Sequence, residues 1–167
     1  FMKTNIIFGI AGWSGSGKTE LMTKLINNLK QYHDLQICAI KHAHDSFKID
    51  HEGKDTYKFS VAGANKVIIS SKSKIAMIEK VNRELSLRKI LANVKGFNVI
   101  LVEGWKKSHI KKIEVCRKDI KMPLLYEDDP SFVAVATDEK NFIPKRNIKI
   151  LNLNNIPSIA SFILEFK

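Results

Sequence analysis

Long apolar runs and cysteine are both scarce in this sequence of 167 residues. No apolar run approaches the roughly 20 residues that a helix needs to cross a bilayer, so membrane association is not expected. The two cysteines, Cys38 and Cys116, each lie in an apolar strand-like run, which favours buried thiols over a disulfide or a metal-binding pair. The residues after Met2 are polar and then run into a strand, so no secretory leader is expected and we predict a cytoplasmic protein.

Internal repeats, low-complexity tracts and linkers rich in Pro, Gly or Ser are also absent. The hydrophobic fraction of 44% and the charged fraction of 27% are those of an ordinary globular protein. A chain of this length fits one domain and can bury a sizeable core. We therefore predict a single domain over residues 2–167, with Phe1 left aside.

Negative charge is in short supply, because 17 Asp and Glu residues face 28 Lys and Arg residues and the net charge is +11. Such an excess suits a polyanionic ligand, such as a nucleotide or a phosphorylated cofactor, or an acidic protein. Lysines that serve only solubility explain the excess equally well. The lysines are spread along the chain without the ladder of aromatic residues on which single-stranded nucleic acid stacks, so nucleic acid is not an expected partner.

Apolar runs alternate with helical stripes along the chain. We predict buried strands over residues 5–11, 36–41, 98–102, 132–136 and 149–153. Helices are predicted over 18–30, 53–64, 84–95 and 157–166, and a hairpin over 66–78. Parallel strands joined by helices predict an α/β fold of three layers, with a mostly parallel sheet flanked by helices and a β-hairpin excursion. In such sheets ligands bind at the carboxyl ends of the strands.

One motif carries a specific chemistry. Residues 12–19 match the P-loop spacing G-x-x-x-x-G-K-[ST] between a predicted strand and a predicted helix. The glycines let consecutive N–H groups point at a phosphate, and the helix N-terminus adds a positive dipole end. Lys18 is expected at the β- and γ-phosphates and the Thr19 hydroxyl at Mg²⁺. The predicted phosphate site is therefore Gly12, Trp13, Ser14, Gly15, Ser16, Gly17, Lys18 and Thr19, in a P-loop nucleotide-binding domain.

Two acidic residues bear on the prediction of this site. Glu103 ends the buried strand over 98–102, where P-loop proteins place the carboxylate that faces the Mg²⁺ ion and its water. We predict that Glu103 contacts the metal and acts with Lys18 in catalysis. Glu20 stands where most P-loops carry a small hydroxyl residue, and we expect its carboxylate to point into solvent because a polyphosphate would repel it.

A dense group of polar residues follows the second predicted strand. We predict that Lys41 and Lys54 face phosphate charge, with Asp50 or Asp55 at the Mg²⁺ ion. A metal site built from His42, His44 and Asp50, or a solvated loop, are open alternatives. The nucleotide-binding residues predicted here are Lys41, His42, His44, Asp50, Lys54 and Asp55, and Asp50 is also a predicted metal ligand.

Three stretches together resemble the molybdopterin-guanine dinucleotide biosynthesis protein B (MobB) family. They are residues 9–19 with Trp13, the run Lys-His-x-His at 41–44 continued by Gly-Lys-Asp-Thr at 53–56 and Ala-Gly-Ala at 62–64, and Leu-Val-Glu-Gly-Trp-Lys at 101–106. The resemblance covers roughly residues 5–107. Family members often carry His-His-Asp where this chain has His44, Asp45 and Ser46.

The resemblance implies a GTP-binding protein with weak Mg²⁺-dependent GTPase activity. It implies a homodimer that assists a partner guanylyltransferase in attaching GMP to molybdopterin, with molybdopterin or its guanine dinucleotide as a second ligand. The chain has no Asn-Lys-x-Asp motif to read guanine. Asp138, after the predicted strand 132–136, is our candidate for a base-reading carboxylate.

Two other functions fit the same P-loop. One is a small-molecule kinase, although such kinases usually carry an arginine-bearing lid and here Arg83, Arg88, Arg117 and Arg146 are scattered along the chain. The other is an adaptor that delivers a cofactor and has a vestigial nucleotide site. Because no arginine finger is evident beside the P-loop, hydrolysis is expected to be slow.

Overall fold

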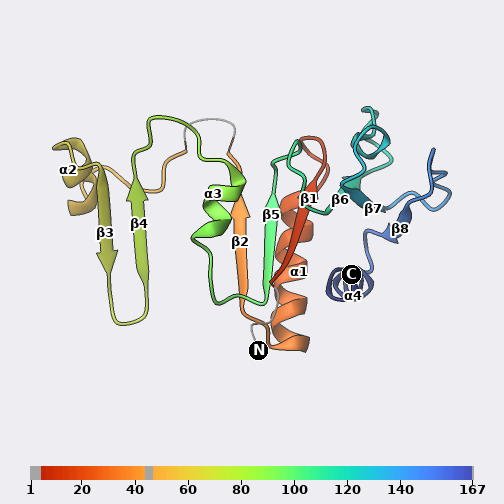
Figure 1. Ribbon diagram of the computed structural model, residues 1–167, viewed down its shortest axis with the longest axis horizontal. Coiled ribbons are helices and arrows are strands. Elements are labelled where there is room, and N and C mark those ends of the chain that lie inside the picture. Colours follow the sequence, from red (N-terminus) through yellow and green to blue (C-terminus); the bar gives the residue numbers. More distant parts are fainter. Residues whose placement is uncertain (1–4, 44–46, 167) are drawn as a thin grey trace. The chain divides into compact units, whose positions relative to one another are not determined.

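The computed structural model describes residues 5–43 and 47–166, which divide into two compact units. The first unit, residues 1–42 with 93–167, contains a six-stranded sheet in which every pair of neighbours is parallel (Figure 1). The order is β2-β5-β1-β6-β7-β8. The strands are β1 (Ile6–Ala11), β2 (Ile37–Lys41), β5 (Val99–Glu103), β6 (Lys112–Cys116), β7 (Phe132–Thr137) and β8 (Lys149–Asn152).

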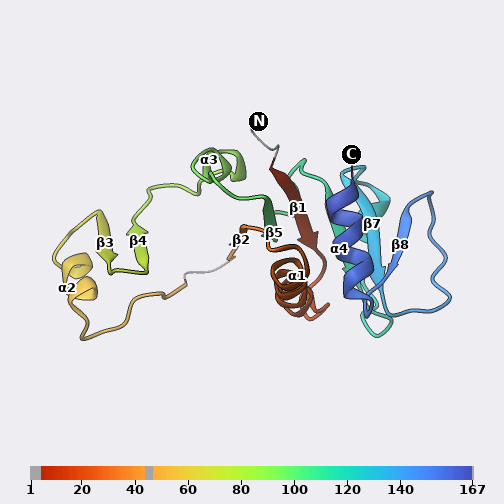
Figure 2. The same ribbon diagram turned by 90° about the horizontal axis from the view of Figure 1, so that it is seen from below.

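Two helices cover one face of this sheet. α1 (Lys18–His33) and α4 (Ile156–Glu165) pack against each other as well as against the strands (Figure 2). Asn155 begins α4 by accepting a hydrogen bond from the Ser158 N–H, and Pro157 lies in the first turn, where its missing N–H costs nothing. The core between helices and sheet includes Leu21, Leu25, Leu29, Ile159 and Ile163 with Phe8, Ile10, Leu101, Ile113 and Val115.

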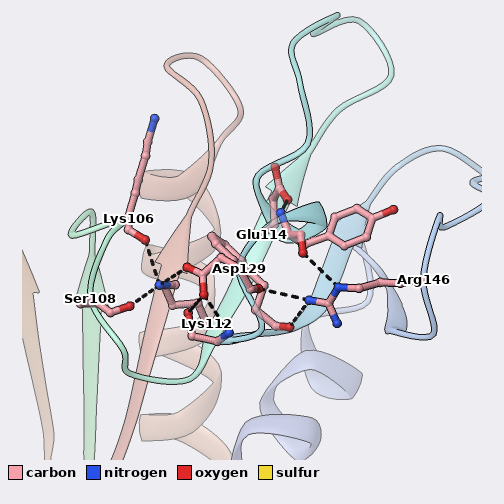
Figure 3. Close-up of polar contacts among 9 residues, drawn as sticks. Lys106, Ser108, Lys112, Glu114, Asp129 and Arg146 are labelled. Atoms are coloured by element: carbon pink, nitrogen blue, oxygen red, sulfur yellow. Dashed lines mark hydrogen bonds and ion pairs between the residues drawn. The ribbon is translucent and has the colours of Figure 1, made fainter.

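The opposite face of the sheet carries buried charge. Lys112 and Glu114, on β6, are 0% and 1% exposed. Alternate residues of a strand point to opposite faces, so Ile113 and Val115 face the helices and these two charged residues face the other way. The Lys112 Nζ atom donates to the Lys106 carbonyl (2.8 Å), to the Ser108 carbonyl and to Asp129 Oδ2 (2.9 Å) (Figure 3). The ammonium is thus surrounded by oxygen acceptors, as a buried cation requires.

The neighbouring carboxylate holds the 3₁₀ helix η1 (Leu125–Glu127). Glu114 accepts the N–H groups of Leu125 and Tyr126 at 2.9 and 2.8 Å. Burial nevertheless raises the pKa of Glu114, and these two hydrogen bonds only oppose the rise. Arg146 closes the layer by donating to three carbonyls, those of Tyr126, Asp129 and Phe132 (Figure 3).

The second unit, residues 43–92, is smaller. It contains α2 (Asp55–Val61), the antiparallel hairpin β3 (Lys66–Ser70) with β4 (Ile75–Glu79), and α3 (Leu87–Ala92). Val67 is buried on the hairpin face that packs on α2, whereas the other face exposes three large apolar side chains. They are Ile68, Ile75 and Met77.

The predicted fold class is confirmed: the first unit has a parallel sheet flanked by helices, and the second unit contains the hairpin. The single domain over residues 2–167 stays a prediction. The helix predicted over 84–95 is shorter, because α3 covers only Leu87–Ala92. Gly96, the glycine directly after the predicted helix, lies four residues past the observed end and does not cap it. Strand β6 is missing from the strands predicted above. Both cysteines are free thiols, half-buried rather than buried. In the described part of the chain, no helix combines the length and the apolarity that crossing a membrane takes.

The buried Lys112 provides a test of this packing. Asp129→Asn removes its countercharge, and we expect the free energy of unfolding to fall by about 2 kcal/mol. Removing one partner of a fully buried ion pair typically destabilises a protein by about 3–5 kcal/mol. The loss expected here is smaller because two carbonyls still accept from Lys112 and the Asp129 side chain is 31% exposed. Urea unfolding with an unchanged m-value is the measurement.

Glu127→Gln is the matched control for Asp129→Asn. It removes a carboxylate two residues away whose partner, Lys145, lies at the surface, and surface pairs contribute little. Equal losses for the two variants would show that Asp129 does not balance a buried charge.

Candidate functional site

The carboxyl ends of three neighbouring strands bring the predicted site together. In register, Lys41 at the end of β2 lies opposite Glu103 at the end of β5, and Glu103 lies opposite Ile10 of β1. The P-loop begins at Gly12, directly after β1. The sheet therefore places Lys41, Glu103 and the P-loop at one edge, as the sequence predicted.

The P-loop backbone takes conformations that only glycine adopts readily. Gly12 has φ of +154°, and a Cβ there would lie 2.5 Å from the Val115 carbonyl oxygen. Gly17 has φ of +92° and begins α1 without a side-chain cap, so the helix end offers N–H groups to a ligand. Ser16 is 1% exposed, and its hydroxyl has no hydrogen-bond partner among the described residues. The loop has the form of an anion cradle.

Lys18 points across this cradle. Its Nζ atom donates to the Trp13 carbonyl at 2.7 Å. Burial lowers the pKa of Lys18; Glu103 opposes the shift, and the positive charges of Lys106 and Lys41 add to it. Two further ammonium groups and one carboxylate therefore act on Lys18 at the mouth of the P-loop. Such an arrangement favours an anion with more than one negative charge.

Thr19 and Glu103 form the predicted metal-binding end of the site. The Thr19 hydroxyl lies 3.1 and 3.0 Å from the two Glu103 carboxylate oxygens, and Lys41 Nζ lies 3.2 Å from Oε1 and 3.4 Å from the hydroxyl. Glu103 is 8% exposed, and its carboxylate is paired with a cation. Hard oxygen donors beside a phosphate cradle fit Mg²⁺, which takes few protein ligands and keeps waters and substrate phosphates. No cluster of three or more His, Cys, Asp or Glu side chains suited to a metal occurs in residues 5–43 and 47–166.

Arg117 corrects a sequence prediction. It was counted among scattered arginines, yet it follows β6 and its Nε donates to the Ser16 carbonyl at 3.1 Å. The guanidinium also contacts Glu20 (3.1 Å) and Asp138 (3.5 Å). An arginine therefore does lie beside the P-loop. Its position follows from β6, the strand that the sequence pattern missed.

Glu20 lies at the surface, as predicted, with a side chain that is 55% exposed. It pairs with Lys24 as well as Arg117, and the hydrogen bond from Lys24, followed by the two positive charges, lowers its pKa. Asp138 accepts the Lys118 N–H at 3.1 Å in addition to its contact with Arg117. A shallow pocket opens beside these groups, and the residues that line it include Gly17, Glu20, Leu21, Lys24, Arg117 and Ile156.

The segment after Glu103 adds residues that the sequence did not assign to the site. Trp105 has φ of +43°, a left-handed conformation that costs a bulky residue about 1–3 kcal/mol. Its ring stacks on His42, with centroids 4.4 Å apart. Lys106 then places its Nζ 4.1 Å from the centroid of the Trp13 ring, whose own Nε1 donates to the Pro123 carbonyl. The motif Glu-Gly-Trp-Lys was visible, but not which of its side chains would reach the P-loop.

The remaining predicted residues belong to the second unit or lie outside the described residues. His44 is outside them. Asp50 accepts the Thr56 hydroxyl (2.9 Å), Lys54 precedes α2, and Asp55 pairs with Lys58 at 3.1 Å. These contacts are all within the second unit, so the roles predicted for Asp50, Lys54 and Asp55 at the nucleotide stay predictions.

Comparisons with known proteins agree with the resemblance. The family model described as molybdopterin guanine dinucleotide synthesis protein B (MobB) matches residues 7–138. The chain is 36% identical over 166 residues to a molybdopterin-guanine dinucleotide biosynthesis adapter protein of Haemophilus influenzae, covering 98% of this chain and 90% of that protein. The corresponding adapter protein of Escherichia coli is 31% identical over 166 residues, covering 96% and 92%. A crystal structure of molybdopterin-guanine biosynthesis protein B is similar at TM-score 0.72 and 26% identity, covering 96% of this chain and 99% of that chain.

The contact between Glu20 and Arg117 leads to a test with inorganic triphosphate and Mg²⁺. Glu20→Gln removes a negative charge beside the cradle and leaves the Arg117 guanidinium less neutralised. We expect triphosphate to bind about two- to fivefold more tightly, as expected for one screened charge at this range. Calorimetric titration measures it.

Asp34→Asn serves as the control, because Asp34 pairs with Lys30 at the far end of the same helix. Weaker binding by Glu20→Gln, or an equal gain in the control, would contradict the role given to this pair.

Proposed function

Because the chain belongs to the molybdopterin guanine dinucleotide synthesis protein B family, we propose that it is an adapter in the synthesis of molybdopterin guanine dinucleotide and that it acts by binding GTP with Mg²⁺. The observation that carries the proposal is the contact of the Thr19 hydroxyl with both Glu103 oxygens beside the P-loop. It supports a metal end and a phosphate cradle in one site.

Different groups of the site have different roles at the nucleotide. Lys18 leaves the Trp13 carbonyl and neutralises the β- and γ-phosphates, while the loop N–H groups hold the phosphate oxygens. Thr19 and Glu103 would hold Mg²⁺, which would supply further charge neutralisation. The Glu103 carboxylate would also orient the attacking water.

The nucleoside lies on the Arg117 side of the site. A shallow pocket there has apolar side chains, Leu21 and Ile156, beside polar ones, the mixture that a purine site requires. Arg117 lines this pocket and contacts Asp138, so a donor and an acceptor lie together on this side. This supports the role predicted for Asp138 in reading the base.

Hydrolysis by the chain alone is slow. Arg117 is the arginine nearest the P-loop in the described part of the chain, and it is bound to Glu20 and Asp138. P-loop GTPases without an arginine at the transition state turn over at on the order of 10⁻⁴ s⁻¹. The contribution to synthesis therefore rests on binding, with a partner guanylyltransferase transferring GMP to molybdopterin. Molybdopterin or its guanine dinucleotide is the second ligand, and the net charge of +11 suits it.

Lys18→Ala tests the function. We expect Mg²⁺–GTP affinity to fall about 100-fold, the loss typical of removing one partner of a hydrogen-bonded charge pair. Lys30→Ala, which removes an exposed lysine at the far end of the same helix, should leave binding unchanged. Calorimetry with GTP and ATP measures both variants and shows which base is preferred.

The same two variants enter a reconstituted assay with the guanylyltransferase. Product formation should depend on Lys18 and not on Lys30. If Lys18→Ala supports full formation of molybdopterin guanine dinucleotide, the nucleotide site is vestigial and the adaptor alternative replaces this proposal.

We propose further that the protein is a homodimer joined through the hairpin of the second unit. A hairpin of two strands is marginal in water by itself, and its outer face exposes Ile68, Ile75 and Met77. Lys66 and Glu79, paired at 2.8 Å beside this face, give it one cation and one anion. Two copies related by a twofold axis can exchange these pairs, which favours a second copy as the occupant.

Met77→Lys tests the dimer. Burying a charge in an apolar interface is costly, so sedimentation should show a shift to monomers at micromolar concentration. Ile143→Lys is the control, because Ile143 is an equally apolar side chain, 86% exposed on the first unit. A wild-type chain that sediments as a monomer would contradict the proposal.

A further inference from the structure

Within residues 5–43 and 47–166, the Lys106 ammonium contacts an aromatic ring and not a carboxylate. Its Nζ lies over the ring of Trp13, 4.1 Å from the centroid. Among the residues that the structure describes, no carboxylate forms an ion pair with it. A cation–π contact is weaker than a charge-assisted hydrogen bond to phosphate, so an arriving phosphate oxygen can draw the ammonium away.

The backbone of Lys106 is firmly held. Its carbonyl accepts from the buried ammonium of Lys112 at 2.8 Å (Figure 3). On the other side, Gly104 and Trp105 both take left-handed conformations, and the Trp105 ring stacks on His42. The turn after Glu103 therefore has one fixed shape, which directs the Lys106 side chain to the P-loop.

The location of the ammonium relative to the cradle indicates which phosphate it meets. Trp13 is contacted twice, by Lys106 at its ring and by Lys18 at its carbonyl, so both cations gather at the start of the loop. Lys106 also follows Glu103, which contacts Thr19 at the metal end. Arg117 lies at the other end, at Ser16. Because the P-loop lysine and Mg²⁺ mark the β- and γ-phosphates, Lys106 belongs to the terminal phosphate.

We propose that Lys106 recognises the terminal phosphate of the bound nucleoside triphosphate and thereby distinguishes GTP from GDP. This inference rests on the proposed GTP binding. With a triphosphate bound, the ammonium exchanges the Trp13 ring for a γ-phosphate oxygen. With a diphosphate it stays on the ring. The Trp13 indole, held by its hydrogen bond to Pro123, is then exposed to a different charge in the two states.

Lys106→Met tests the proposal by calorimetry with Mg²⁺ and either a non-hydrolysable GTP analogue or GDP. We expect affinity for the analogue to fall about tenfold, as for the loss of one charge-assisted hydrogen bond, and affinity for GDP to change by less than about twofold. Lys107→Met, which removes the same charge one residue further on, should leave both affinities unchanged. Lys106→Arg keeps a cation and should keep the preference.

Tryptophan fluorescence gives a second readout. The chain has two tryptophans, so Trp105→Phe leaves Trp13 alone while keeping an aromatic ring against His42. The GTP analogue should change the Trp13 emission in this background and GDP should not, and Lys106→Met should abolish the difference.

Three results would overturn the inference. They are equal losses of both nucleotides in Lys106→Met, no loss of either, and a Trp13 emission that responds alike to GTP analogue and GDP. If the wild-type protein binds neither nucleotide, the proposed GTP binding itself fails, and this inference with it. Thermal melts of each variant separate these outcomes from misfolding.

Discussion

The register between β2, β5 and β1 is the constraint on which the site depends. It sets Lys41 opposite Glu103 and Glu103 opposite Ile10, two residues before the P-loop. A slip of one residue would turn the Glu103 side chain to the other face of the sheet. The burial of all five residues of β5 fixes this register, because Val99 and Leu101 pack beneath α1. The apolar core thus determines where the Glu103 carboxylate lies.

The buried charge of β6 supports the same site from the other face. Lys112 fixes the backbone at Lys106 and Ser108, and so the turn that follows Glu103. Glu114 fixes η1. The residues just before η1 include Pro123, whose carbonyl accepts from the Trp13 indole of the P-loop. Both loops that border the cradle are therefore anchored by the buried polar side chains of Lys112 and Glu114. Such anchoring is demanding, since a buried charge without its partners is strongly destabilising.

The sequence predicted what depends on local pattern. The P-loop follows β1, and Lys41 and Glu103 end β2 and β5, so the predicted placement at one edge of the sheet is observed, while their binding roles stay predictions. Strand β6 was missed because Lys112 and Glu114 break the continuous apolar run typical of a buried parallel strand, and their partners are distant in sequence. Arg117 was missed with it. Helix α3 is shorter than its pattern. The family was identified from three motifs and their order along the chain. This order is a property of the sequence and does not depend on tertiary contacts.

We propose that one edge of the sheet binds the phosphates and the metal together. The decisive experiment is a crystal structure with a non-hydrolysable GTP analogue and Mn²⁺, located by its anomalous signal. We expect Mn²⁺ bound to the Thr19 hydroxyl and facing Glu103, with Lys18 moved from the Trp13 carbonyl to the phosphates. A metal bound elsewhere, or Lys18 still on that carbonyl beside a bound nucleotide, would contradict it.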